Sequence, residues 1–275
     1  MMTEIIRTKD ISQQLGVPRF IAQLVMKLLG VNRINRMYQE VAHLGLDGVG
    51  LIDEALNMQN LEVHIKGENN VPEYGPFIMI SNHPFGFWDG LILLNRINKI
   101  RPGFMVTGNF LLKLVKHFEP YIIEVNPFDR KGPKRMGAGT KVLQALEKGL
   151  PVGLFPAGEV ATTYDGLNTP ARDKEWGISS IKLIQQAGVP IVPVFFEGQN
   201  SQLFHLLGKL HPAFRTMMIP GEFVRKKNGS IRFHIGEPIT ADTIQQYDDL
   251  KKLRDYLRKR TEELPLNKTT SLVTA

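Results

Sequence analysis

Apolar residues follow two different periodicities along the chain, and the change between them falls near residue 60. From residue 10 to about 58, apolar positions recur at helical spacing, and Pro18 gives a helix start signal. Beyond residue 60, short β-branched runs bounded by Gly, Pro and Asn alternate with amphipathic stretches of helix length. The pattern predicts an N-terminal helical annex (1–58), packed on an α/β domain (59–265), and a frayed tail (266–275).

Seven short apolar runs in the second region predict the strands of one sheet. They are Leu61–Ile65, Phe77–Ser81, Gly103–Thr107, Tyr121–Val125, Val152–Phe155, Ile191–Phe196 and Ile231–Ile235. Helices are expected between most of them and include Gly90–Arg96, Met136–Lys148, Ile178–Ala187 and Thr243–Glu263. Strands that alternate with helices in this way are typical of an α/β fold.

One helix of the annex combines an apolar stripe with a partly basic row. The large apolar side chains at helical spacing are Phe20, Ile21, Leu24, Val25, Leu28 and Leu29. Arg19, Gln23 and Lys27 lie four positions apart beside that stripe. The pattern is typical of a buried helix in a small bundle, and also of a helix that docks on a membrane surface. Both interpretations can hold for different faces of the helix.

The amino-acid composition limits the chemistry that the protein can perform and the cellular location that we expect for it. The 275 residues are 43% hydrophobic and 22% charged, which suffices for one substantial core. Cysteine is absent, which excludes disulfides, thiolate nucleophiles and zinc–thiolate sites.

The first ten residues lack the features of a secretory signal, and no apolar run approaches the roughly 20 residues of a spanning helix. We therefore expect a cytoplasmic, peripheral protein. A net charge of +7 permits anionic lipid, an acidic carrier protein or nucleic acid as partners.

Residues 78–90 (Ile-Met-Ile-Ser-Asn-His-Pro-Phe-Gly-Phe-Trp-Asp-Gly) run from a predicted buried strand through a loop into a helix. His83 follows the carboxyl end of that strand, where α/β sheets bind ligands. Pro84 favours an extended backbone at His83, and Asp89 can fold back to accept a ring N–H. Such a pair can be a structural helix cap. It can also be a catalytic pair, in which neutral imidazole takes the proton of an alcohol that attacks a thioester.

Four motifs in order between residues 82 and 194 resemble those of the lysophospholipid acyltransferase superfamily. The first is Asn82-His83 followed by Asp89, with five intervening residues where most members have four. The longer spacer is similar to the haemolysin-like branch, which includes O-acyltransferases of ornithine and glycine lipids. The fourth motif, Val-Pro-Ile-Val-Pro-Val, occupies residues 189–194 unchanged. The resemblance covers most of residues 60–240.

The second motif of the superfamily ends an apolar strand with Asp-Arg, and Arg130 is the matching position. A cationic cluster follows, made of Arg130, Lys131, Lys134 and Arg135. It can bind the phosphate of a phosphopantetheine donor or a lipid headgroup. A basic run before a helix is also typical of a solvated surface.

The third motif departs from the superfamily pattern Phe-Pro-Glu-Gly-Thr-Arg. Residues 155–160 read Phe-Pro-Ala-Gly-Glu-Val, so the Glu is displaced and the Arg is missing. In the family that Arg is associated with the phosphate of a glycerol phosphate acceptor, and its loss favours an aminoacyl lyso-lipid. Gly158 lets backbone approach a ligand closely. Glu159 can contact a polar group of the acceptor or serve as a helix-start carboxylate.

The resemblance implies a mixed, largely parallel sheet flanked by helices and an O-acyltransferase activity. The acyl group would pass from an acyl-ACP or acyl-CoA thioester to a lyso-lipid hydroxyl, with a lyso-glycine or lyso-ornithine lipid favoured. His83 is the expected general base and Asp89 the residue that orients it. The expected substrate-binding residues are Asn82, Arg130, Lys131, Phe155, Pro156, Gly158 and Glu159. No metal or cofactor is expected, and the substrates imply work at the cytoplasmic face of a membrane.

Three other functions remain as alternatives. One is a 1-acyl-glycerol-3-phosphate acyltransferase, which differs in the acceptor. Another is a lipid hydrolase or thioesterase, which would have to activate water with the same histidine because no Gly-x-Ser-x-Gly elbow is present. The last is a non-catalytic lipid or nucleic-acid binder, although no nucleic-acid module accompanies the positive charge. Donor, acyl-chain length, acceptor headgroup and oligomeric state stay open.

Overall fold

A computed structural model describes residues 7–28, 30–108, 112, 115–125, 137–210 and 212–266. Its centre is a seven-stranded sheet with the order β1-β7-β6-β2-β5-β3-β4. The strands are β1 (Glu62–Lys66), β2 (Ile78–Ser81), β3 (Met105–Gly108), β4 (Ile122–Glu124), β5 (Val152–Leu154), β6 (Ile191–Glu197) and β7 (Ser230–Ile235). All seven expected strands are confirmed, with small differences at their ends.

Neighbouring strands are parallel throughout the sheet except for one pair. β6 and β7 are antiparallel, so β1 and β7 run opposite to the other five strands. The mixed, largely parallel sheet is therefore confirmed. β2 lies between β5 and β6, and the carboxyl ends of these three strands meet at one edge of the sheet.

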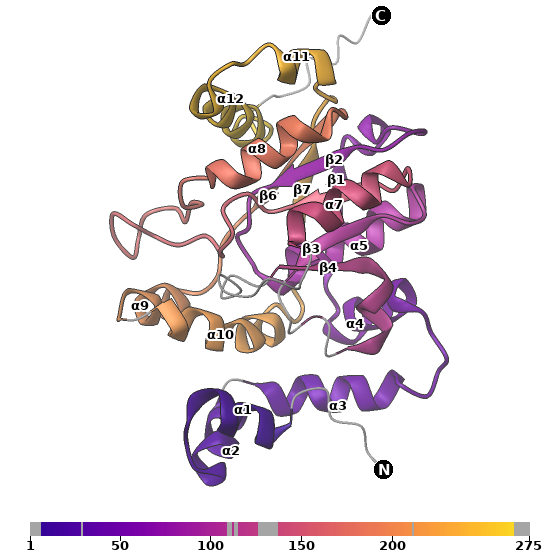
Figure 1. Ribbon diagram of the computed structural model, residues 1–275. Coiled ribbons are helices and arrows are strands. Elements are labelled where there is room, and N and C mark those ends of the chain that lie inside the picture. The colour runs from indigo at the N-terminus through magenta and orange to yellow at the C-terminus, as the bar shows by residue number, and fades with distance from the viewer. Residues whose placement is uncertain are drawn as a thin grey trace, which may run out of the picture.

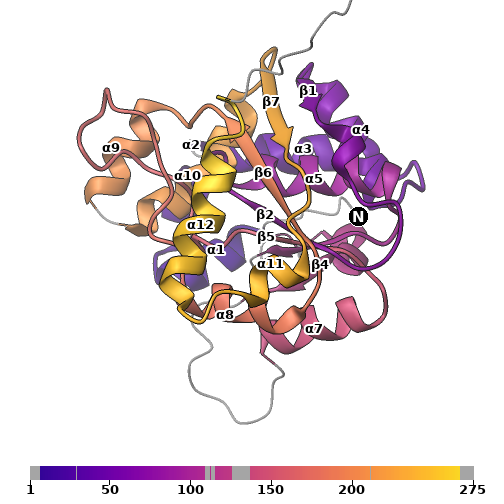
Figure 2. The same ribbon diagram turned by 90° about the horizontal axis from the view of Figure 1, so that it is seen from above.

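Helices cover both faces of the sheet (Figures 1 and 2). α5 (Phe87–Ile100) and α4 (Gly48–Gln59) lie on one face, while α7 (Ala138–Glu147), α8 (Ile178–Ala187) and α12 (Leu250–Glu262) lie on the other. Side chains around β2 alternate between the two cores. Phe77 and Met79 pack with α5, and Ile78 and Ile80 pack with α8 and α12. The central strand is thus buried on both sides, as parallel strands usually are.

Two of the expected helices have different bounds. α5 begins at Phe87, earlier than the expected Gly90, so Asp89 lies in its first turn. The expected single helix Thr243–Glu263 is wrong, because it is two helices, α11 (Ala241–Gln245) and α12. Asp249 between them is an N-cap whose side chain accepts the Lys251 N–H. An N-cap starts a new helix, which a common apolar face does not reveal.

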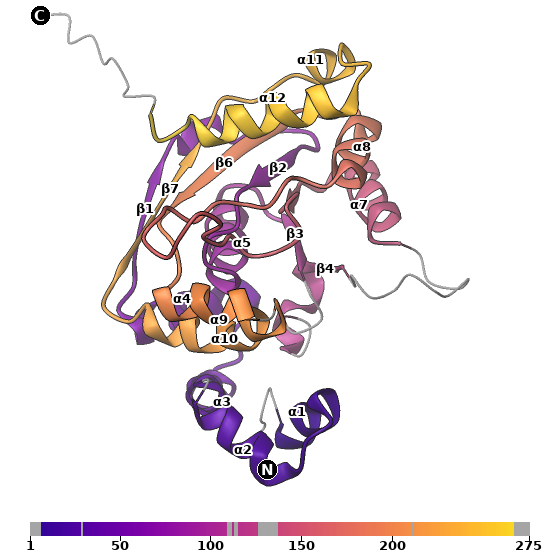
Figure 3. The ribbon, with the colours of Figure 1, turned by 90° about the vertical axis from the view of Figure 1, so that its left-hand side faces the viewer.

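Two further helices, α9 (Gln202–Leu210) and α10 (Pro212–Arg225), connect β6 to β7. They pack against each other, and α10 also contacts α5 and α3 (Val31–Val41). In Figure 3 they lie near α4, on the side of the molecule away from α12. A short 3-10 helix, η1 (Glu68–Asn70), follows β1, and another, η2 (Lys116–Tyr121), precedes β4.

The annex consists of α1 (Thr8–Leu15), α2 (Arg19–Leu28), α3 and α4. It joins the α/β domain through helices, since α4 packs against α5 and α3 against α10. α1 and α2 project from the end far from α12 (Figures 1 and 3). Phe20 is 70% exposed and Leu24 is 56% exposed, so burial in a helical bundle is wrong for these two residues. In the described part of the chain, no helix is long and apolar enough to cross a membrane.

Candidate active site

His83 and Asp89 lie in contact at the carboxyl end of β2. The His83 Nδ1 atom is 2.8 Å from Oδ2 of Asp89. The loop between them turns at Gly86, whose φ of 79° suits a residue without Cβ. Oδ2 of Asp89 also accepts the N–H groups of Phe85 at 2.9 Å and Gly86 at 3.0 Å. The same carboxylate therefore caps the first turn of α5, as one interpretation of the spacing predicted, and it contacts the imidazole, as the other interpretation requires.

Asp89 is fully buried, whereas the His83 side chain is 18% exposed. Burial raises the pKa of Asp89 above its ordinary value, and the contacts with His83 and the two backbone N–H groups oppose that rise. Because Nδ1 faces Asp89, Nε2 is the nitrogen left to accept a proton from a ligand. The arrangement fits a general base whose ring orientation is set by a buried carboxylate.

The main chain of His83 is held on both sides. Its N–H donates to Oδ1 of Asp173 at 3.0 Å, and its carbonyl accepts the Ala161 N–H at 2.8 Å. Asp173 is buried, and its Oδ2 accepts the indole N–H of Trp176 at 2.9 Å. These contacts fix the position of the residue that carries the imidazole. No sequence pattern indicated Asp173, because it lies in a polar stretch without regular periodicity.

The ring of His83 stacks on Phe155, with centroids 4.2 Å apart and an interplanar angle of 30°. Phe155 follows β5 directly, and the β2–β5 register pairs Ile80 with Leu154, which brings the two loops together. Asn82 uses its side chain within the protein, because its amide exchanges two hydrogen bonds with the Phe196 main chain at 2.8 and 2.9 Å. Asn82 thus ties the loop that carries His83 to the end of β6.

The remaining residues of the third motif form a loop around His83. Pro156 is buried, Gly158 is exposed with a φ of 69°, and Glu159 is partly exposed. Glu159 pairs with Arg215 of α10 at 2.7 Å, a partner that no sequence pattern indicated. Arg130 and Lys131, together with Lys134 and Arg135, lie outside the described residues.

One more cation lies near the pair. Lys226, directly after α10, sits 4.0 Å from the centroid of the Phe85 ring and donates to the Gln199 carbonyl at 3.1 Å. Burial lowers the pKa of Lys226, while Glu222 and Asp89 oppose that change. Lys226 therefore contributes positive charge close to the buried Asp89 carboxylate.

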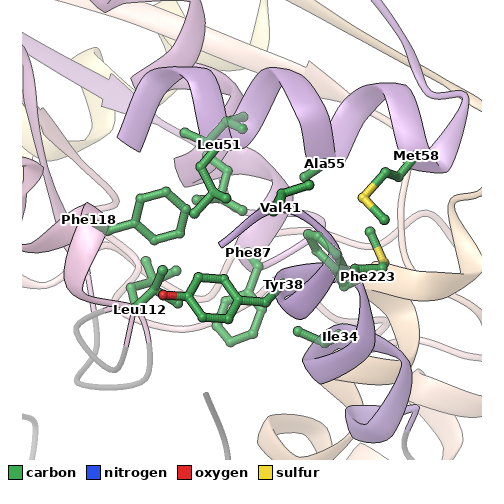
Figure 4. A pocket seen from close by; sticks show the side chains of 14 residues that line it. Ile34, Tyr38, Val41, Leu51, Ala55, Met58, Phe87, Leu112, Phe118 and Phe223 are labelled. Carbon is green, nitrogen blue, oxygen red and sulfur yellow. The ribbon is translucent and has the colours of Figure 1, made fainter. Parts of the chain in front are cut away.

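An apolar cavity lies beside the helix that carries Asp89 (Figure 4). Its unfilled space, mouth included, is about 740 Å³. Side chains of α3, α4, α5 and α10 line it, among them Ile34, Tyr38, Leu51, Ala55, Phe87 and Phe223. Phe87 lies two positions before Asp89, so the cavity reaches the first turn of α5. Size and lining suit a hydrocarbon chain.

Known proteins resemble the chain over nearly its whole length. The lyso-glycine lipid O-acyltransferase of Bacteroides thetaiotaomicron is 26% identical over 268 residues, which cover 93% of each chain. The protein of that name from Phocaeicola vulgatus is 25% identical, over 88% of this chain and 87% of its own. The solved 1-acyl-sn-glycerophosphate (LPA) acyltransferase PlsC of Thermotoga maritima superposes with a TM-score of 0.52 at 16% identity. That match covers 91% of this chain and 89% of PlsC, and it shows a common fold.

The sequence model of one family, described as acyltransferase, matches residues 9–269. That span includes most of the annex, the whole sheet and the residues that surround the imidazole. The resemblance to lysophospholipid acyltransferases inferred from the four motifs is confirmed. With a match of this length, the chain belongs to the acyltransferase family and is an enzyme that transfers acyl groups.

Proposed function

We propose that the protein moves a fatty acyl group from a thioester to the hydroxyl of a lyso-glycine lipid. The observation that carries this proposal is the 2.8 Å contact between Nδ1 of His83 and Oδ2 of Asp89, which leaves Nε2 for the acceptor hydroxyl. The acceptor follows from the names of two relatives at about 25% identity. The missing Arg of the third motif, where Val160 stands, favours it over a glycerol phosphate acceptor.

The reaction needs no covalent enzyme intermediate. Nε2 of His83 takes the hydroxyl proton as the acceptor oxygen attacks the thioester carbonyl carbon. A C–O bond forms, the C–S bond breaks, and the leaving thiolate takes the proton back from the imidazolium. Asp89 stabilises the imidazolium during transfer, and general-base action of this kind contributes about 100-fold to 10,000-fold. The donor is acyl-ACP or acyl-CoA, and Arg130 and Lys131 remain the predicted phosphate-binding residues.

The apolar cavity is the proposed site for the acyl chain. Phe87 and Leu91, four positions apart on one face of α5, line it, and Phe87 lies two positions before Asp89. The cavity is lined mainly by hydrocarbon, as a fatty acyl group requires.

The exposed face of α2 is the proposed membrane contact. Phe20 and Leu24 present apolar side chains to solvent, and Arg19 and Lys27 are exposed near them. Apolar side chains beside basic ones suit an anionic bilayer surface. The enzyme would then take its lipid acceptor directly from the membrane.

In the direct test, the purified protein is incubated with vesicles that contain lyso-glycine lipid and with either acyl-CoA or acyl-ACP. The diacylated product is then measured by mass spectrometry. The wild-type protein should form that product with at least one donor, and His83→Ala should form none while it keeps its melting temperature. Absence of product from the wild-type protein with both donors would overturn the proposal.

Two parallel incubations separate the alternatives. Lysophosphatidic acid in place of the lyso-glycine lipid tests the glycerol phosphate acceptor, and faster turnover with it would replace the proposed acceptor. An incubation with the thioester donor alone, without acceptor, tests the hydrolase alternative. Release of free fatty acid without acceptor, at the rate of transfer, would show that water is the true acceptor.

A further inference from the structure

Three charged side chains from distant parts of the chain meet beside the catalytic loop. Oε2 of Glu159 is 2.7 Å from a guanidinium nitrogen of Arg215, and its Oε1 is 3.4 Å from Nζ of Lys174. The Arg215 side chain is only 13% exposed, while that of Lys174 is 62% exposed. The Glu159 carboxylate therefore contacts one largely buried cation, Arg215, and one accessible cation, Lys174.

The loop that carries Glu159 contacts His83 through residues at both ends of the loop. Phe155 stacks on the imidazole, and the N–H of Ala161 donates to the His83 carbonyl. Glu159 lies between these two contacts. Gly158 next to it is exposed, and a Cβ placed there would have no atom within 4 Å. There is open space for a ligand group at this point of the loop.

α10 brings Arg215 to the same place from the other side. Ile219 lies one turn further along α10, and a Cβ on Gly86 would come within 3.2 Å of its Cγ2. Gly86 donates its N–H to Asp89. Since residues four apart share one helix face and a turn rises about 5.4 Å, Arg215 lies about one turn from the catalytic loop.

Positive charge is in excess in this group. Among the residues that the structure describes, Glu159 is the one carboxylate within salt-bridge distance of Arg215 or Lys174. The nearby acids Asp165 and Glu175 pair with other arginines, and the buried Asp173 carboxylate accepts the N–H groups of His83 and the Trp176 indole. Tyr164 beside the group stays neutral at pH 7, because burial and the Glu159 charge raise its pKa. One carboxylate thus faces two cations.

We propose that Arg215 and Lys174 bind the headgroup carboxylate of the lipid acceptor, while Glu159 holds the guanidinium in place. The inference rests on the proposed function and deepens it. A glycine joined to a fatty acid through its nitrogen keeps a free carboxylate, and a planar guanidinium suits that group bidentately. These cations come from α10 and the loop before α8, at places where the four motifs have no counterpart.

The test compares two acceptors that differ only in this charge, lyso-glycine lipid and its methyl ester. Arg215→Gln should raise the KM for the acid about 10-fold or more and leave the KM for the ester nearly unchanged. Lys174→Gln should show the same selectivity with a smaller change, because its side chain is solvated. Arg225, an exposed arginine at the other end of α10, provides the matched control. Arg225→Gln should have the same KM as the wild-type protein for both acceptors.

Equal losses with acid and ester would overturn the inference while leaving acyl transfer established. A rise in the KM for the thioester donor, with no change for the acceptor, would overturn it too, since the cations would then bind a donor phosphate. Arg215→Lys keeps the charge and should recover part of the selectivity. If Arg215→Gln does not fold, Lys174→Gln decides alone, and a KM ratio of acid to ester equal to that of the wild-type protein would refute the proposal.

Discussion

Asp173 holds the main chain of His83 from 90 positions further along the chain, with its Oδ1 accepting the His83 N–H at 3.0 Å. The other carboxylate oxygen accepts the Trp176 indole N–H, and Arg258 of α12 donates to the Asp173 carbonyl at 3.2 Å. Asp173 is therefore fixed from several sides while it fixes His83. It touches no reacting atom, so we regard it as a positioning residue.

Asp173→Ala should lower kcat by about 10-fold to 100-fold with little change in the KM for either substrate. The reason is that a small displacement of a catalytic group costs rate more than binding. Steady-state kinetics in vesicles measure this split. Asp165→Ala, on the same segment but exposed, is the matched control. A kcat equal to that of the control would contradict the positioning role.

Asp89→Asn should abolish most activity and yet stabilise the fold at neutral pH. Burial raises the pKa of Asp89 in the folded protein above its unfolded value. The native state then disfavours the ionised carboxylate, so its contribution to stability is complete below the unfolded pKa and is lost as pH rises through the folded pKa. The neutral amide avoids that loss.

Melting temperatures of the wild-type protein and Asp89→Asn across a pH series check this prediction. The difference in favour of the variant should be largest above the raised pKa of Asp89 in the folded protein, and it should shrink as the pH falls through that pKa toward the pKa of the unfolded chain. A variant less stable than the wild-type protein at every pH would show that the hydrogen bonds from Phe85 and Gly86 to the carboxylate, with its contact to His83, outweigh its desolvation.

Ala55→Phe should shift the enzyme toward shorter acyl donors. Ala55 lines the apolar cavity, and a phenyl ring there would occupy space proposed for the hydrocarbon chain. Turnover of a C16 donor should fall by about 10-fold or more, whereas a C8 donor should be used nearly as well as by the wild-type protein. Relative rates with donors of graded length measure the shift. Equal losses at all lengths would place the acyl chain elsewhere.

Phe20→Asp combined with Leu24→Asp should abolish binding to anionic vesicles. Each large apolar side chain contributes about 1.5–3 kcal/mol when it leaves water, so losing both should weaken partitioning by about 100-fold or more. Vesicle flotation measures the bound fraction. Tyr74→Asp, which changes a side chain 85% exposed on the loop between β1 and β2, is the control. Flotation of the double variant at the wild-type level would exclude α2 as the contact.

The sequence by itself determined the strands and the contact between His83 and Asp89, because both depend on local patterns. Short β-branched runs between turn residues mark strands wherever they later pair, and all seven are present. His83 and Asp89 are separated only by a loop and the first turn of a helix, so a strand end, Pro84 and a helix start suffice to bring them together. The mixed sheet and the acyltransferase family followed from motifs of known order.

Only the tertiary structure decided which distant residues reach that pair. β2 lies between β5 and β6, and this order places Phe155 on the imidazole and Phe196 on Asn82. Asp173 and Arg215 carry no local signal, since the residues around a charged side chain in the sequence do not show which distant partner it will meet. The same holds for Phe20 and Leu24, whose exposure depends on what packs against α2. Burial and long-range pairing are properties of the packed chain, and periodicity along the sequence does not encode them.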